Sequence, residues 1–136
     1  MKARFISPLI VRDDGGTLIL ADTLFYNSDV LQGTLTVRAG FPTDFASIPR
    51  PLWIILPPLG KYDAAAVCHD KLYRDGAFRR RAIARCVADQ VLNEAMRASG
   101  VSPVHRWLIY AGVRLFGWIV WCHYRFHRRL LDARSA

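Results

Sequence analysis

The chain has 136 residues, of which 52% are hydrophobic, so its length fits one domain that can bury a sizeable core. Its formal net charge of +8 predicts an acidic partner: a nucleic acid, an anionic membrane face or an acidic protein surface. The three cysteines stand far apart without a CxxC spacing, which argues against a secreted disulfide scaffold and for reduced thiols.

The first forty residues predict a small antiparallel sheet. Short β-rich runs cover 4–11 and 17–20, and the Asp-Asp-Gly-Gly segment between them is typical of a hairpin turn, because glycine accepts a positive φ and aspartate tolerates it. Further strands are predicted over 23–26 and 34–39, the second from its alternation of apolar and polar residues. The N-terminus has no apolar run, so no signal peptide is expected.

Residues 41–60 predict an ordered loop that wraps around the domain. Five of the seven prolines lie between positions 42 and 58, which excludes a long regular element. The segment is nevertheless too apolar for a solvated linker, since residues such as Phe45 and Trp53 need packing partners. Loops that a scaffold holds in this way often carry functional residues.

Three helices are predicted after the loop. The first carries His69 and breaks at Asp75-Gly76, the second covers about 78–98, and Ser102-Pro103 opens the third as an N-cap followed by proline at N1. The prediction is therefore a single α+β domain. Its parts are a sheet at 1–40, the wrapped loop at 41–60, three helices at 61–127 and a basic tail at 128–136.

The third helix is apolar nearly all round from Trp107 to Cys122, with Arg114 as its one charge. A membrane span needs about 20 apolar residues without a central arginine, so no span is expected. The first interpretation is a central core helix packed by the other helices and the sheet. The alternative is an interfacial helix on a membrane surface, which three tryptophans and a basic end would suit.

A polar cluster is predicted where the first two helices meet. His69 and Tyr73 are four residues apart and share a helix face, while Asp89 lies at the edge of the apolar arc of the second helix. If Asp89 binds one ring nitrogen, His69 could deprotonate a water through the other, so these three residues are the candidate catalytic group. The alternative is a purely structural His–Asp–Tyr network.

Asp70 points about 100° round the helix axis from His69, so it suits a separate role. Together with Asp44 or backbone carbonyls of the proline-rich loop, it is predicted to bind a divalent cation that polarises the substrate.

Three motifs carry a resemblance to a known family. Gly-Phe-Pro-Thr-Asp-Phe-Ala-Ser-Ile-Pro-Arg at 40–50, His-Asp-Lys-Leu-Tyr at 69–73 and Ala-Asp-Gln-Val-Leu-Asn-Glu-Ala-Met at 88–96 resemble the DUF1353 family, encoded largely by tailed phages and prophages. The resemblance covers most of the chain and implies a phage origin without an established function. The signature polar residues it implies are Asp44, Ser47, His69, Asp70, Tyr73 and Asp89.

The first helix is also similar, over about thirty residues, to the active-site helix of secreted phospholipases A2. The resemblance implies that His69 activates water, Asp70 binds calcium, and Asp89 with Tyr73 steadies the histidine. The chain departs from that pattern, because Ala66 and Leu72 replace the flanking disulfide cysteines and the Gly-rich calcium loop is missing.

These readings predict a phage-encoded, metal-assisted hydrolase of lipid or other esters. The alternative is a non-catalytic phage tail, virion or assembly component. The expected location is the host cytoplasm or the virion, and the expected partners are other phage proteins or a membrane surface, with nucleic acid as a further acidic partner.

Other patterns carry weaker signals. Ser47 has no nucleophile-elbow context, although a group of Ser47, His69 and an aspartate stays an alternative. His123 and His127 are four residues apart and could share a metal, but without a third ligand in register they are typical of a basic helix end. The arginine clusters at 79–85 and 125–129 are typical of solvated faces.

Overall fold

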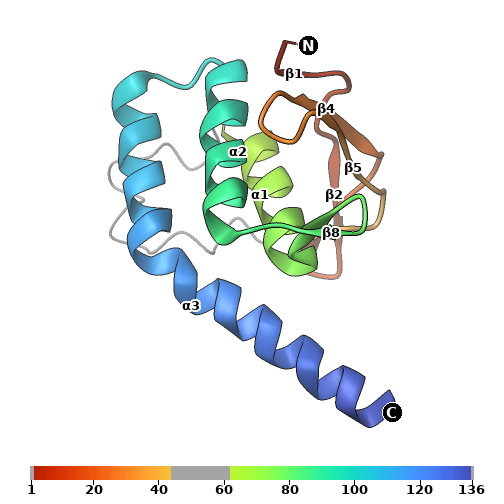
Figure 1. Ribbon diagram of the computed structural model, residues 1–136. Coiled ribbons are helices and arrows are strands. Elements are labelled where there is room, and N and C mark those ends of the chain that lie inside the picture. Colours follow the sequence, from red (N-terminus) through yellow and green to blue (C-terminus); the bar gives the residue numbers. More distant parts are fainter. Residues whose placement is uncertain (1, 44–61, 136) are drawn as a thin grey trace.

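Strands form the N-terminal part of the described chain, and the remainder is helical apart from one short hairpin between the first two helices, as the α+β prediction required (Figure 1). The computed structural model describes residues 2–43 and 62–135. The predicted loop at 41–60 therefore lies largely outside the described residues, and so do Asp44 and Ser47.

Within these described residues, the strands form two three-stranded antiparallel sheets and one short hairpin. One sheet has the order β1-β4-β5 and the other β2-β3-β6, while β7 pairs with β8. The strand bounds are β1 Arg4–Phe5, β2 Val11–Asp14, β3 Thr17–Leu20, β4 Leu24–Ser28, β5 Gly33–Val37, β6 Pro42–Thr43, β7 Ala77–Phe78 and β8 Arg81–Ala82. The run predicted as one strand over 4–11 is thus divided between β1 and the start of β2.

Strand alternation determines which side chains reach the core. In the β4–β5 pair Leu24 faces Val37 and Tyr26 faces Leu35, and all four are buried. Ala39 lies beyond the end of β5 and is exposed, contrary to the predicted alternation. The predicted hairpin turn is confirmed between β2 and β3, where Gly15 and Gly16 both have positive φ.

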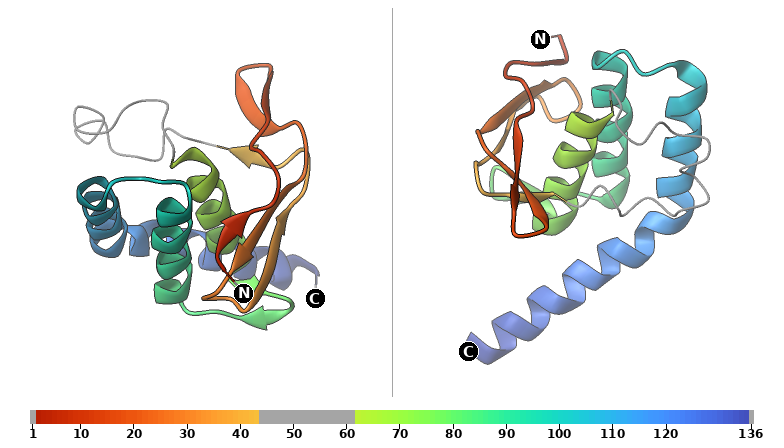
Figure 2. Two further views of the ribbon diagram at one scale, coloured as in Figure 1. Left: turned by 90° about the horizontal axis from the view of Figure 1, so that it is seen from above. Right: turned by 180° about the vertical axis from the view of Figure 1, so that it is seen from behind.

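The helices are α1 Asp63–Asp75, α2 Arg85–Ala98 and α3 Pro103–Ser135. Helix α1 ends at Gly76, whose left-handed backbone lets its N–H bond the carbonyl of Leu72. Figures 1 and 2 show α1 and α2 between the β1-β4-β5 sheet on one side and the first half of α3 on the other. The core lies in this arrangement, since α1 contacts β5 and α2 contacts β1 and β4.

Glu94 fastens α2 to the end of the sheet. Its carboxylate accepts hydrogen bonds from the hydroxyls of Tyr26 and Ser28 at 2.8 and 2.7 Å. It also accepts the backbone N–H groups of Asp29 and Val30, both at 3.0 Å. These bonds fix the register between the helix layer and the strand layer, and with it the position of α2.

The second helix begins later than predicted. Residues 77–82 form the β7–β8 hairpin, and α2 starts only at Arg85. Arg79 and Arg80 form the turn of this hairpin with φ of 49° and 65°. The sequence gives no signal for this turn, because two arginines rarely adopt the positive φ that it requires.

The third helix is not the central core helix of the first interpretation. Its buried residues within the described chain are Ile109 and Gly117, while Trp107, Leu115 and Phe116 are more than half exposed. The helix also continues to Ser135, so the predicted tail at 128–136 is helical up to that residue. Its C-terminal end projects away from the rest of the protein (Figure 1).

Candidate functional site

The carboxylate of Asp89 is the centre of a buried polar network that joins all three helices. Asp89 on α2 is completely buried. Its Oδ1 accepts a bond from the hydroxyl of Tyr73 at 2.6 Å and lies 2.8 Å from Nε2 of His69, both on α1. Its Oδ2 accepts bonds from Arg114 of α3 at 2.8 Å and from Arg85 of α2 at 3.3 Å. The predicted catalytic residues His69, Tyr73 and Asp89 thus meet in one place.

Helical periodicity explains why His69 and Tyr73 reach the same oxygen. The residues are one turn apart on α1, and their ring centroids are 4.0 Å apart at an interplanar angle of 44°. Trp121 of α3 packs edge-on against Tyr73 with a centroid separation of 5.2 Å. The three rings therefore hold the donor groups of α1 against Asp89.

Gly117 allows α3 to approach this network closely. A Cβ atom at this position would lie 2.5 Å from the hydroxyl oxygen of Tyr73 and 3.2 Å from Nη1 of Arg85. Arg85 in turn donates to the backbone carbonyls of Val113 and Arg114. A glycine at this helix crossing is therefore required by space rather than by backbone conformation.

The network keeps Asp89 ionised. Burial would raise the pKa of its carboxyl, but the hydrogen bonds from His69, Tyr73 and Arg114 outweigh burial, and the pKa is lowered. Burial and the bond to Asp89 raise the pKa of the Tyr73 hydroxyl, so Tyr73 stays protonated and donates. A carboxylate that accepts from both residues favours the His69 tautomer with its proton on Nε2.

His69 can therefore be oriented as a base. With its proton on Nε2 directed at Asp89, its Nδ1 carries a lone pair. The histidine retains 7% of its accessible surface, whereas Asp89 retains none. His69 is therefore buried as well, and its second ring nitrogen is the atom through which it could act as a general base. The same burial suits a structural network in which His69 pairs α1 with α2.

The predicted cation site is only partly within the described residues. Asp70 on α1 is partly buried, and Asp44 lies outside the described residues. Within residues 2–43 and 62–135, no group of three or more His, Cys, Asp or Glu side chains is arranged to hold a metal ion. His123 and His127 stack with centroids 6.4 Å apart on an exposed face of α3. The cation role of Asp70 stays a prediction.

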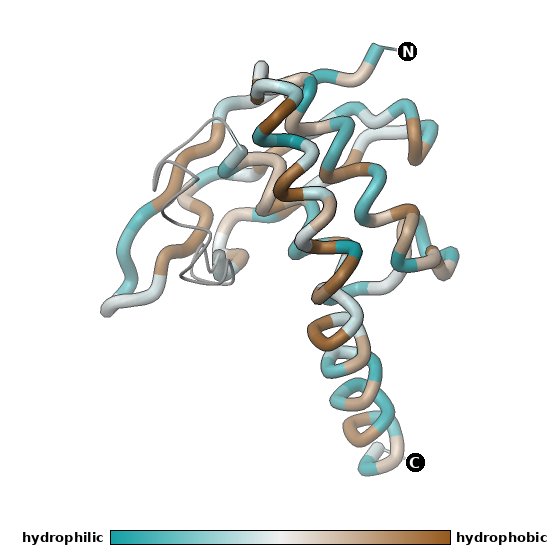
Figure 3. The backbone as a smooth tube through the Cα atoms, turned by 90° about the vertical axis from the view of Figure 1, so that its left-hand side faces the viewer, coloured by the Kyte–Doolittle hydropathy of each residue, from teal (hydrophilic) through white to brown (hydrophobic). Residues whose placement is uncertain are grey.

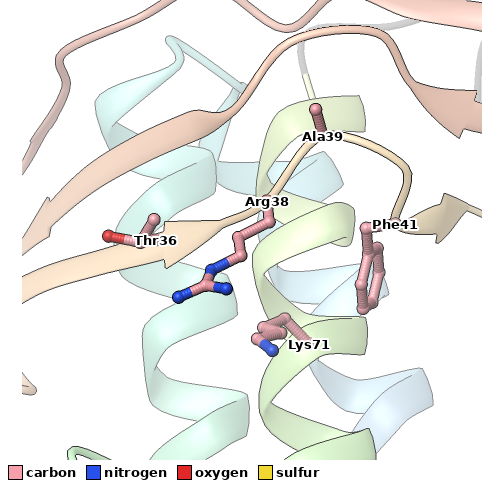
Figure 4. A pocket seen from close by; sticks show the side chains of 5 residues that line it. All are labelled: Thr36, Arg38, Ala39, Phe41 and Lys71. Atoms are coloured by element: carbon pink, nitrogen blue, oxygen red, sulfur yellow. The ribbon is translucent and has the colours of Figure 1, made fainter.

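A cavity of about 430 Å³ opens on another flank of α1, lined by Thr36, Arg38, Ala39, Phe41 and Lys71 (Figure 4). Its ionisable side chains, those of Arg38 and Lys71, are cationic. Arg74 lies over the Phe41 ring at 4.9 Å from its centroid. Among the described residues, neither His69 nor Asp89 lines this cavity, so it is separate from the Asp89 network.

Sequence reasoning missed Arg85, Arg114, Gly117 and Trp121. Two signals were present: Arg85 precedes Asp89 by four residues on one helix, and Arg114 is the one charge in the apolar run of α3. Cys68, which precedes His69 on α1, is fully buried. Burial raises the pKa of its thiol, which makes it inert.

The fold and the network define an α+β protein with one buried His–Asp–Tyr site at the junction of its helices. The chain belongs to the DUF1353 family: the family described as "Protein of unknown function (DUF1353)" matches residues 18–113, more than half of the chain. The match includes His69, Tyr73, Arg85 and Asp89 and ends just before Arg114. Searches of curated proteins and of solved structures gave no significant match. None of these comparisons shows the resemblance to phospholipases A2.

Proposed function

We propose that this protein is a hydrolase in which His69 is the general base and Asp89 its orienting carboxylate. The observation that carries the proposal is the pairing of His69 Nε2 with Asp89 Oδ1 at 2.8 Å, while Tyr73 donates to the same oxygen. An imidazole held in this way by a buried anion has a fixed tautomer, and its second ring nitrogen is left to accept a proton.

The reaction that suits this pair is ester hydrolysis. Nδ1 of His69 takes a proton from water while the water oxygen bonds to the ester carbonyl carbon. The bond from that carbon to the alcohol oxygen then breaks, and the alcohol leaves with the proton from Nδ1. Asp89 stabilises the imidazolium formed between these steps. Lipid esters are the substrate class we put forward.

Asp70 completes the proposal as a ligand for a divalent cation. It lies next to His69 on α1, and its side chain leaves the helix about 100° further round the axis. A hard cation such as calcium prefers carboxylate and carbonyl oxygens and would polarise the ester carbonyl. Asp44 is the second ligand we expect.

The test is hydrolysis of fluorogenic esters of short and long acyl chains, with calcium and with a chelator. We expect His69→Gln to lose about two to four orders of magnitude in rate. His127→Gln, which replaces an exposed histidine of α3, is the matched control and should keep the wild-type rate. Equal rates in wild type and His69→Gln would contradict the general-base role.

A second candidate function has its own observation. Arg85 and Arg114 occupy Oδ2 of Asp89 while His69 and Tyr73 lie at Oδ1, so the carboxylate connects α1, α2 and α3. This fits a non-catalytic phage tail, virion or assembly component in which the network only holds the helices together. Its signature would be a large loss of stability in His69→Gln and no ester hydrolysis by the wild type.

A further inference from the structure

Helix α3 carries apolar side chains on the side that faces away from the protein. Among its exposed residues are Leu115, Phe116, Ile119, Phe126 and Leu130, with exposed fractions of 65%, 59%, 54%, 65% and 48%. We call these five residues the outer face of α3. In Figure 3, where α3 lies in front, hydrophobic segments recur along its length.

The outer face is continuous because of its spacing. Leu115, Phe126 and Leu130 lie within about 40° of Ile119 around the helix axis. The residues that contact the protein lie on the other side, where Gly117 meets Tyr73 and Arg125 donates to the carbonyl of Arg74. The outer face therefore has no partner among the described residues, although its composition is that of a buried surface.

The charges of α3 indicate what covers this face. The helix contains six arginines and one acidic residue, Asp132. Arg114, Arg125 and Arg128 donate to groups of α1 and α2. Arg129 and Arg134 are exposed and flank Ile119 at about 80° and 60° on opposite sides. An apolar strip bordered by arginines suits an anionic surface with an apolar interior.

The other occupants fit less well. A second copy of α3 would bring like charges together along the helix, since each copy has six arginines against one acidic residue. Nucleic acid would need the cations, rather than aliphatic and aromatic groups, at the centre of the contact. Among the described residues, no helix combines the length and hydrophobicity that crossing a bilayer requires.

We propose that the outer face of α3 inserts into the headgroup region of an anionic membrane, with the helix axis parallel to the surface. Arg129 and Arg134 contact lipid phosphates, and Trp118, 55% exposed at the edge of the face, lies at the boundary between headgroups and acyl chains. The proposal goes beyond the hydrolase proposal and does not depend on it, because none of these residues belongs to the Asp89 network.

The test is co-sedimentation of the full chain with vesicles of neutral phosphatidylcholine or of phosphatidylcholine with a quarter phosphatidylglycerol. We expect at least tenfold stronger partitioning into the anionic vesicles, falling as salt is raised. Ile119→Ser should weaken partitioning about fivefold, and Ile119→Ser with Phe126→Ser more than tenfold. Arg129→Gln with Arg134→Gln should remove most of the preference for anionic lipid.

The matched control is Ile6→Ser. Ile6 is the same residue type with nearly the same exposed fraction, 55% against 54% for Ile119, but it lies beside β1. This variant should bind vesicles like the wild type, and melting curves should show that all variants are folded. His69→Gln should also bind normally if it is folded, which separates failure of this proposal from failure of the hydrolase proposal.

Three results would overturn the proposal. The first is wild-type binding that Ile119→Ser with Phe126→Ser leaves unchanged, and the second is no binding to anionic vesicles. The third is a stable dimer in solution that this double variant converts to a monomer, which would assign the face to a second copy of the chain. If the second result comes with binding to a DNA or RNA duplex, and Arg129→Gln with Arg134→Gln abolishes that binding, the surface belongs to nucleic acid.

Discussion

Nε2 of His69 lies 2.8 Å from Oδ1 of Asp89 across the contact between α1 and α2, although the two residues are 20 positions apart in the sequence. The pairing sets the orientation of the imidazole and depends on the ionised carboxylate. Because Asp89 also binds Arg114 of α3, one carboxylate connects the candidate site with the packing of the helices. A substitution of Asp89 should therefore lower stability, whereas a substitution of His69 that leaves the other partners of Asp89 in place should lower the reaction rate.

Asp89→Asn should destabilise the protein strongly. The amide cannot pair with two guanidinium groups, and its NH₂ group would face at least one donor. Breaking a buried ion pair costs about 3–5 kcal/mol, and we expect about 3 kcal/mol because Arg114 is partly exposed. Urea unfolding measures the loss, with the exposed Asp132→Asn as the control. A change below about 0.5 kcal/mol would contradict the central role of Asp89.

The lowered pKa of Asp89 predicts a specific dependence of stability on pH. A carboxyl whose pKa is lower in the folded protein contributes stability that is complete above its unfolded pKa of about 4, and this is lost as pH falls through the folded pKa. As pH falls below about 4, the free energy of unfolding should therefore decrease more steeply for the wild type than for Asp89→Asn. Parallel curves over this range would show that other carboxyls dominate acid unfolding.

Gly117→Ala tests the close approach of α3 to Tyr73. On an exposed helix this change would stabilise by about 1 kcal/mol through helix propensity. Here the new methyl would lie 2.5 Å from the Tyr73 hydroxyl, so we expect destabilisation by about 1–3 kcal/mol. The same change in a Tyr73→Phe background should cost clearly less, because the hydroxyl is gone. An equal cost in both backgrounds would locate the strain elsewhere.

The sequence was sufficient for the parts of the site that depend on local geometry. The spacing of His69 and Tyr73 places both on one face of α1, and the apolar arc of α2 leaves Asp89 at its edge, so their meeting could be predicted. Arg114 and Gly117 could not be placed, because their roles depend on how α3 crosses the other helices. Their partners are 25 and 44 positions away.

The errors in the fold have similar physical origins. The β7–β8 hairpin depends on positive φ at Arg79 and Arg80, which local propensity does not favour. The apolar composition of α3 suggested a core helix, but composition does not distinguish a surface buried by the protein from one that is left exposed. Strand register was easier, since alternation in 34–37 is visible in the sequence and β4 pairs with it residue by residue.

Calcium should stabilise the wild type through Asp70 if Asp70 is a ligand. A ligand that binds only the folded state at ten times its dissociation constant contributes about 1.4 kcal/mol, which raises the melting temperature by several degrees. Asp70→Asn should lose this increment, whereas Asp75→Asn at the end of α1 should keep it. The comparison uses the calcium-induced change within each protein, so a basal effect of the substitution does not enter. Identical increments in wild type and Asp70→Asn would remove Asp70 as a ligand.

His69→Gln separates the catalytic from the structural role of the network. Glutamine has a polar amide of similar reach that can donate to Asp89 Oδ1, but it cannot carry a proton between water and substrate near neutral pH. A general base predicts a folded variant with a melting temperature near that of the wild type and a rate lower by about two to four orders of magnitude. A structural partner predicts a loss of about 1–3 kcal/mol in the free energy of unfolding. We expect the first result, because Tyr73, Arg85 and Arg114 continue to hold Asp89 when the imidazole is replaced. A variant that unfolds with the larger loss would assign His69 to the packing of the helices.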